Sequence, residues 1–143
     1  MKPLYTASVT STGGRNGRVQ SSDGAVNLAL AAPPALGGNG KGANPEQLFA
    51  AGYAACFAGA MDYIAHQQKL SPGEISILSK VAIGPDDSGA FTLAVELDVT
   101  VPGLDQAAAE ALVAQAHQAC PYSRATRGNI EVRLTARAGK IEA

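Results

Sequence analysis

Residues 44–69 read NPEQLFAAGYAACFAGAMDYIAHQQK, and they predict the central element of the fold. Asn44 is a good helix N-cap, Pro45 suits the first helical position, and Gln47 can complete a capping box with Asn44. The stretch therefore predicts one helix that runs to about Lys69. Residues 48–61 are apolar on every face of that helix, which predicts a central, buried element.

Small residues recur along one side of the same helix. Gly52, Cys56, Gly59 and Ala60 lie at helical spacing, so another backbone can approach this side closely. The apolar run of residues 48–61 is too short to span a bilayer and is typical of a buried helix. We therefore expect no membrane-spanning segment here.

Six predicted strands flank the helix, and their order gives the fold class. A second helix is expected over residues 106–119, with Asp105 as its N-cap and Pro121 ending it. The order βββ-α-ββ-α-β separates strands from helices and predicts an α+β fold in a single domain, residues 1–143. The strands are expected at about residues 4–12, 17–21, 25–31, 75–83, 91–101 and 129–137.

Two turn motifs and a glycine-rich loop connect the N-terminal elements. Asn16-Gly17 and Asp23-Gly24 are typical of type I′ hairpin turns, and they predict a three-stranded meander. Residues 37–42, GGNGKG, indicate a flexible connector. A phosphate-binding GxxxxGK[ST] loop would need glycine at position 35 and serine or threonine at position 42, where alanine and glycine stand.

Composition narrows the functional classes. The chain has 143 residues, with 11 Lys and Arg against 12 Asp and Glu, so its charge gives no reason to expect nucleic acid or an anionic membrane as a partner. No secretory signal is evident at the N-terminus, so we expect a cytoplasmic protein, in which any disulfide is transient. Charged residues reach only 16%, and a core rich in alanine and glycine suggests oligomerisation.

The two cysteines occupy different helical positions. Cys56 lies in mid-helix, where burial of an isolated thiol raises its pKa, so it becomes a nucleophile only if a cation reaches it. Cys120 lies at a helix C-terminus, where the helix dipole disfavours a thiolate. If the two meet, Cys56 is the better attacking thiol and Cys120 the better resolving thiol. By count alone, both could equally be inert core residues.

Arg15 and Glu46 are the candidate charges for Cys56. Arg15 lies at the tip of the first predicted hairpin, and Glu46 in the first helical turn can orient an arginine side chain. Either residue could also have an ordinary role, in a solvated turn or at a helix dipole. Glu46 is about 15 Å from Cys56 along a straight helix. Three alternatives follow: a helix broken near Gly52, a long Arg15 that bridges the gap, or a partner subunit that supplies Arg15 and Glu46.

Metal binding has weak support. His117 and Cys120 have a ligand-like spacing, and Cys56 and His66 lie elsewhere, but no paired-ligand motif is present. We expect no metal site, and we expect both histidines at exposed helical positions.

Three separated motifs resemble the organic hydroperoxide resistance (Ohr) family, a branch of the OsmC superfamily. They are GGRNG at residues 13–17, NPEQLFAAGYAACF at 44–57, and CPYS at 120–123 followed by ATRGNI at 125–130. The resemblance runs from about residue 4 to residue 134. It implies an OsmC-like fold, with antiparallel sheets around two central buried helices, and an intertwined homodimer.

The same resemblance implies a thiol-dependent peroxidase. It assigns Cys56 as the peroxidatic cysteine, Cys120 as the resolving cysteine, Arg15 as the thiolate-activating residue and Glu46 as its partner. It also implies organic hydroperoxides, fatty-acid hydroperoxides included, as substrates. Lipoylated protein is the implied dithiol reductant, and no cofactor is held by the chain. Arg124 stands where the family usually has asparagine.

The implied reaction passes through a disulfide. The Cys56 thiolate attacks the peroxide and becomes a sulfenic acid, Cys120 condenses with it, and an external dithiol reduces the bond. Phe49, Phe57 and Tyr122 are candidates for an apolar entrance. Two other functions stay open: a peroxidase of the OsmC branch with another hydroperoxide preference, and a non-enzymatic redox sensor.

Overall fold

The computed structural model describes residues 1–139, which form two compact units. The first is Met1–Leu48, and the second begins at Phe49. Strands and helices are segregated along the chain, which confirms the predicted α+β class. That the whole chain is one domain stays a prediction.

The first unit is built on a three-stranded antiparallel meander. Its strands are β1 (Val9–Thr12), β2 (Arg18–Ser21) and β3 (Asn27–Ala29), paired in the order β1-β2-β3. The meander prediction is confirmed, although the first and third strands are shorter than expected. A short 3-10 turn, η2 (Pro34–Leu36), lies in the connector that follows.

The two turns of the meander are not of the predicted type I′. Between β1 and β2 lies a 3-10 turn, η1 (Gly14–Asn16), and positive φ values fall on Gly13 (80°) and Gly14 (62°) instead of Asn16. In the second turn Gly24 has a positive φ of 76°, whereas Asp23 has none. Glycine adopts this conformation without a steric penalty, so the neighbouring asparagine and aspartate avoid it. Arg15 therefore lies within a compact turn between two strands.

Helix α1 (Pro45–Gln67) begins as predicted and ends two residues early. The Asn44 N–H donates to Gln47 Oε1 at 3.1 Å, and the Gln47 N–H donates to Asn44 Oδ1 at 2.9 Å, which confirms the capping box. The helix continues through Gly52 without interruption, so a break at that residue was the wrong alternative.

The second unit contains a three-stranded sheet and two further helices. The sheet consists of β4 (Ser76–Pro85), β5 (Phe91–Thr100) and β6 (Glu131–Arg137), in the order β4-β5-β6. Strands β4 and β5 are antiparallel, but β5 and β6 are parallel, so the prediction of antiparallel sheets is wrong for this pair. The helices α2 (Gln106–Ala119) and α3 (Pro121–Thr126) lie between β5 and β6 in the chain. A helical connection of this kind allows the next strand to pair in parallel with the one before it.

Both ends of α2 follow from the sequence, but α3 does not. Asp105 Oδ1 accepts the Ala108 N–H at 2.8 Å and caps α2 as predicted. Pro121 ends that helix, and it also occupies the first turn of α3. Proline fits there because the N–H that it lacks would have no partner within the helix. Cys120 is thus the joint between two helices.

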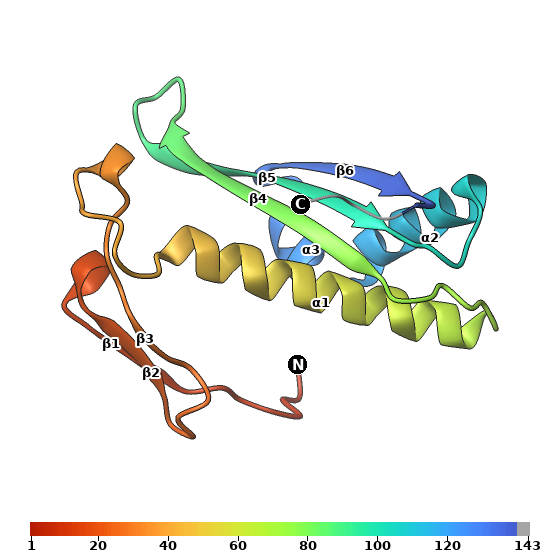
Figure 1. Ribbon diagram of the computed structural model, residues 1–143, viewed down its shortest axis with the longest axis horizontal. Coiled ribbons are helices and arrows are strands. Elements are labelled where there is room, and N and C mark those ends of the chain that lie inside the picture. The colour runs from red at the N-terminus through yellow and green to blue at the C-terminus, as the bar shows by residue number, and fades with distance from the viewer. Residues whose placement is uncertain (140–143) are drawn as a thin grey trace. The chain divides into compact units, whose positions relative to one another are not determined.

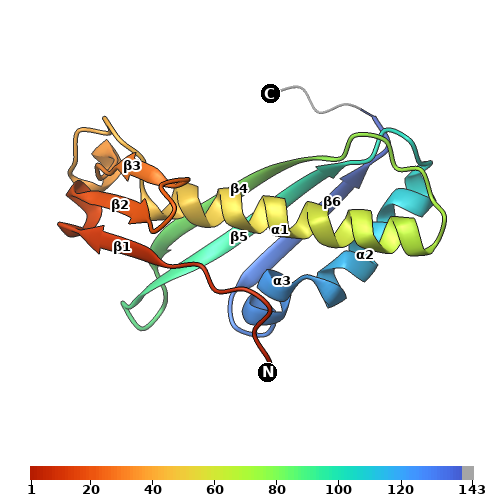
Figure 2. The same ribbon diagram turned by 90° about the horizontal axis from the view of Figure 1, so that it is seen from below.

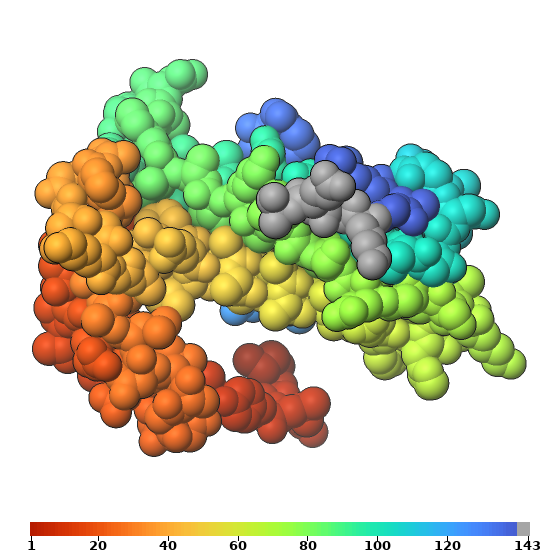
Figure 3. Space-filling model, in the orientation of Figure 1, coloured from red at the N-terminus to blue at the C-terminus, as the bar shows by residue number. Residues whose placement is uncertain are grey.

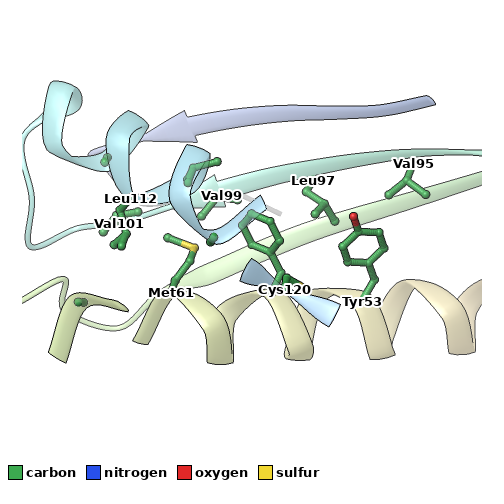
Figure 4. Close-up of a cluster of buried hydrophobic side chains, with 13 residues drawn as sticks. Tyr53, Met61, Val95, Leu97, Val99, Val101, Leu112 and Cys120 are labelled. Atoms are coloured by element: carbon green, nitrogen blue, oxygen red, sulfur yellow. The ribbon is translucent and has the colours of Figure 1, made fainter. Parts of the chain in front are cut away.

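The core of the second unit lies between the sheet and the helices α1 and α2 (Figures 1 and 2). Buried side chains of both helices meet the core-facing residues of β5, as Figure 4 shows. Burial of these apolar side chains is the main favourable contribution to folding of this unit. The fully buried members with large side chains include Tyr53, Phe57, Met61, Val95, Leu97, Val99, Val101 and Leu112.

Only one side of α1 is buried in the described chain. Tyr53, Phe57, Met61 and Ala65 face the core. The surface of the second unit in Figure 3 includes a long band formed by this helix, so the prediction of burial on every face is wrong for a single chain. The opposite side carries the exposed residues Ala51, Ala55, Gly59 and Tyr63.

By length and composition, α1 could cross a membrane. An 18-residue window of it has a mean hydropathy of 1.3. The core helix of a soluble protein passes the same test, and α1 packs four side chains into the core of the second unit. The packing therefore favours a core helix.

Candidate active site

The two cysteines meet in the second unit. Cys120 Sγ lies 3.6 Å from Cys56 Sγ, and both thiols are free. Cys56 is half-buried on α1, whereas Cys120 is fully buried. A disulfide needs a sulfur–sulfur distance of about 2.05 Å, so a small movement of either side chain would bring the sulfurs to bonding distance, and an oxidant that accepts two electrons would then join them. The two cysteines that the family resemblance pairs therefore lie side by side, while their catalytic roles stay a prediction.

Backbone hydrogen bonds to both α2 and α3 hold Cys120 in place. The Cys120 N–H donates to the Ala116 carbonyl at 2.8 Å, and the Cys120 carbonyl accepts the Arg124 N–H at 2.9 Å. Cys120 is therefore the C-cap of α2 and the N-cap of α3 at once. Its backbone is anchored in both directions, and its thiol is directed to α1.

The environment of Cys56 disfavours a thiolate. Burial raises the pKa of the Cys56 thiol above its ordinary value, and the neighbouring Cys120 adds to the rise. A backbone hydrogen bond from Tyr122 acts in the opposite direction, but burial outweighs it. Cys56 therefore needs a nearby positive charge to react as a thiolate at neutral pH.

Arg15 and Glu46 form a bidentate ion pair within the first unit. Arg15 Nη1 donates to Glu46 Oε2 at 2.8 Å, and Arg15 Nη2 donates to Glu46 Oε1 at 2.7 Å. The Glu46 side chain is 13% exposed and the Arg15 side chain 38%. The pair sets the direction of the guanidinium, because two parallel bonds leave it one orientation. The predicted pairing is confirmed, while the role of the pair toward Cys56 stays a prediction.

Protonation of Glu46 would break this ion pair. The hydrogen bonds from Arg15 hold the pKa of the Glu46 carboxyl below 4.5, its ordinary value. The stabilisation from this ion pair is therefore present above that ordinary value, and it is lost only as the pH falls through the lowered pKa. At neutral pH the guanidinium keeps its orientation.

The sequence did not predict a buried polar cluster on the helices that carry the cysteines. His66 is exposed as predicted, but His117 is half-buried, and its Nδ1 lies 2.8 Å from Ser123 Oγ. Burial lowers the pKa of His117, and the charge of Arg127 lowers it further. Tyr53, a polar residue within an apolar helix, carried a signal for the cluster, since a buried tyrosine hydroxyl requires a partner.

The three aromatic residues predicted to form an entrance differ in their exposure. Phe57 is fully buried in the core, so its predicted place in an entrance is wrong. Tyr122 is 40% exposed, and its ring centre lies 6.3 Å from that of Phe49 and 5.8 Å from that of Tyr53. An added Cβ on Gly52 would lie 3.2 Å from the Tyr122 hydroxyl, so the small residue at this position makes room for the ring.

Within residues 1–139, no group of three or more His, Cys, Asp or Glu side chains is arranged to hold a metal ion.

Comparison with known proteins gives close relatives over nearly the whole chain. The sequence model of the OsmC-like protein family matches residues 38–135. An organic hydroperoxide resistance protein from Xanthomonas axonopodis pv. citri is 60% identical over 94% of this chain and 95% of its own length. The organic hydroperoxide resistance protein OhrB of Bacillus subtilis is 46% identical over 92% of this chain and 96% of its own.

Solved structures agree with these relatives. The crystal structure of an organic hydroperoxide resistance protein from Legionella pneumophila has a TM-score of 0.91 at 49% identity, covering 95% of this chain and 99% of its own. A more distant chain, an OsmC-like protein from Mycoplasma pneumoniae at 16% identity, still has a TM-score of 0.67, which shows a shared fold.

Proposed function

This chain belongs to the OsmC-like protein family and, within it, to the organic hydroperoxide resistance (Ohr) proteins, and we propose that it is a cysteine-based peroxidase. Relatives at 60% and 46% identity support a role in organic hydroperoxide resistance. The observation that carries the chemical proposal is the pair of free thiols, Cys56 and Cys120, 3.6 Å apart.

Cys56 performs the first step of the proposed reaction. Its thiolate attacks the terminal oxygen of the hydroperoxide, the O–O bond breaks, and the leaving alkoxide takes up a proton and departs as an alcohol. The sulfur retains one oxygen as a sulfenic acid. We propose Arg15 as the cation that favours the Cys56 thiolate and Glu46 as the residue that orients Arg15, in line with their ion pair.

Cys120 and an external dithiol complete the cycle. The Cys120 sulfur attacks the sulfenic sulfur, a disulfide forms, and water is released. A dithiol then reduces the disulfide through a mixed-disulfide intermediate and is itself oxidised. A dithiol of the dihydrolipoamide type, carried by a lipoylated protein, is the proposed reductant, and the chain needs no bound cofactor for these steps.

The protein is proposed to act as a cytoplasmic homodimer. The β1 strand has no buried residue, and Val9 on it is 54% exposed. The uncovered side of α1 carries small residues, among them Ala55 and Gly59, against which a second helix can pack closely. A second copy that covers these surfaces would bury apolar area left exposed in one chain, in line with the low charged fraction of 16%.

A steady-state assay tests the proposed activity. Purified protein is supplied with dihydrolipoamide and with tert-butyl, fatty-acid or hydrogen peroxide, and peroxide loss is followed. We expect the organic hydroperoxides to be consumed catalytically and faster than hydrogen peroxide. A preference for hydrogen peroxide would favour a different peroxidase of the OsmC type. Consumption of a single equivalent in the presence of excess dithiol would favour a redox sensor.

Replacing Cys120 with serine is expected to separate the two halves of the cycle. The Cys120→Ser variant should consume its first equivalent of peroxide at the wild-type rate, because Cys56 is intact, and should form no intramolecular disulfide. Rapid-mixing measurements of peroxide loss, with dimedone labelling of the sulfenic acid, check both points. A Cys120→Ser variant that turned over with dihydrolipoamide as fast as the wild type would contradict a resolving role.

A further inference from the structure

A hydrogen-bonded chain in the second unit joins side chains of the same helices that carry the two cysteines. His117 Nδ1 lies 2.8 Å from Ser123 Oγ, and Ser123 Oγ lies 2.7 Å from the Tyr53 hydroxyl. The Tyr53 hydroxyl lies 3.0 Å from Thr126 Oγ1, which donates to the Ser123 carbonyl at 3.2 Å. Tyr53, Ser123 and Thr126 are buried, so water does not compete with these bonds.

The number of available hydrogens determines which group donates in each bond of this hydrogen-bonded chain. The chain contains four hydrogen bonds, and its three hydroxyls supply one hydrogen each. Thr126 uses its hydrogen on the Ser123 carbonyl, so the Tyr53 hydroxyl must donate to Thr126. Ser123 then donates to Tyr53, and the fourth hydrogen must come from His117 Nδ1. Neutral His117 is therefore the tautomer with its hydrogen on Nδ1 and a free lone pair on Nε2.

The hydrogen-bonded chain links the helices that carry the two cysteines. His117 and Ser123 lie three residues before and three residues after Cys120, so their bond spans the joint between α2 and α3. Tyr53 lies three residues before Cys56 on α1, and its bond to Ser123 ties that helix to α3. The hydrogen-bonded chain thus restrains the two backbone segments that carry the Cys56 and Cys120 sulfurs.

We propose that Tyr53, Ser123 and His117 are positioning residues that hold the Cys120 joint against α1 and so favour the Cys56–Cys120 disulfide. The importance of this for turnover rests on the proposed peroxidase function, since only the resolving step uses Cys120. The positioning itself does not rest on that function, because it concerns how readily two thiols join with any oxidant.

The His117 tautomer is the direct test of the hydrogen count. Nitrogen-15 NMR of wild-type protein with labelled histidine distinguishes the two neutral tautomers of the ring. We expect the His117 pattern of the Nδ1–H tautomer above the His117 pKa, with exposed His66 as the internal reference for a solvated ring. A dominant Nε2–H tautomer at His117 would overturn the direction of the chain.

A thiol-exchange equilibrium tests the positioning without any peroxide. Wild type and Tyr53→Phe are equilibrated with glutathione and its disulfide, so that one glutathione disulfide is reduced to two glutathiones for each Cys56–Cys120 bond formed. We expect the effective concentration of the two thiols to fall about tenfold in Tyr53→Phe, the equivalent of one to two hydrogen bonds. The matched control is Tyr63→Phe, on the same helix, where the hydroxyl is exposed and accepts a hydrogen bond from Gln67.

Variants at Ser123 and His117 separate positioning from general loss of stability. Ser123→Ala should lower the effective concentration as Tyr53→Phe does. His117→Asn should retain the wild-type value, since its amide can donate from a place close to that of Nδ1, whereas His117→Gln should not. The rate of the first peroxide step should stay within twofold of wild type in Tyr53→Phe, because that step does not involve Cys120.

The outcomes distinguish the two proposals. An unchanged effective concentration in both Tyr53→Phe and Ser123→Ala, in protein that reduces peroxides, would overturn the positioning role and leave the function standing. A lowered value in protein that reduces no peroxide would support the positioning role and overturn the function.

Discussion

Cys56→Ser is expected to reduce the consumption of organic hydroperoxide to the uncatalysed rate, a loss of at least about a thousandfold. Serine has nearly the shape of cysteine, but its hydroxyl is not ionised at neutral pH and forms no sulfenic acid or disulfide. The helix that carries Cys56 should be unaffected, because this side chain is only half-buried and caps no helix. Loss of activity would therefore report lost chemistry and not lost folding.

The measurement is steady-state turnover of an alkyl hydroperoxide with dihydrolipoamide. Ala114→Ser is the matched control, since it introduces the same residue at an exposed position of helix α2. Circular dichroism and thermal unfolding of both variants establish that they are folded. Wild-type turnover by Cys56→Ser would refute the proposed peroxidase mechanism, because no other residue is assigned the attack.

Arg15→Gln is expected to slow the reaction of Cys56 with peroxide by about 10- to 1,000-fold at neutral pH. An adjacent positive charge lowers the pKa of an acidic group by about one to three units, and each unit changes the thiolate fraction about tenfold. Since burial already raises the pKa of Cys56, removal of the cation should leave nearly all of the thiol protonated. The lost rate should return as the pH rises toward the new pKa.

The pH profile of Cys56 alkylation by iodoacetamide, in a Cys120→Ser background, measures this shift directly. Arg18→Gln is the matched control: Arg18 lies three residues further along, in the same meander, and bonds exposed Asn27 instead of Glu46. The Arg18→Gln profile should coincide with that of the parent protein. Coincident profiles for Arg15→Gln and the parent would show that Arg15 does not set the reactivity of Cys56.

Local signals were sufficient for the elements whose ends depend on neighbouring residues. The capping box at Asn44 and the Asp105 cap of α2 were predicted because each is completed within four residues of sequence. Strand β5 was predicted to within one residue, since its alternation reflects one buried face. The turn types were wrong, because glycines at positions 13 and 14 offered a conformation that the dipeptide rule does not consider.

The candidate site was predictable residue by residue but not in its packing. Family resemblance indicated Cys56, Cys120, Arg15 and Glu46, and the thiol pair and the ion pair are both present. The hydrogen-bonded chain from His117 was missed, because local spacing does not indicate that Tyr53 shares hydrogen bonds with residues 70 and 73 positions further along the sequence.

Local sequence patterns and motifs were sufficient to predict the α+β class, the central helix with its N-terminal capping box, and the two cysteines of the candidate site. These follow from periodicity and capping, which act over a few residues, and from motifs that a relative can share. The packed structure was needed to show that β6 runs parallel to β5 and that the Cys120 thiol, at the start of α3, faces α1. It also decided that one side of α1 stays uncovered in a single chain. These features depend on which distant surfaces bury one another, and burial is a property of the packed chain that no local pattern records.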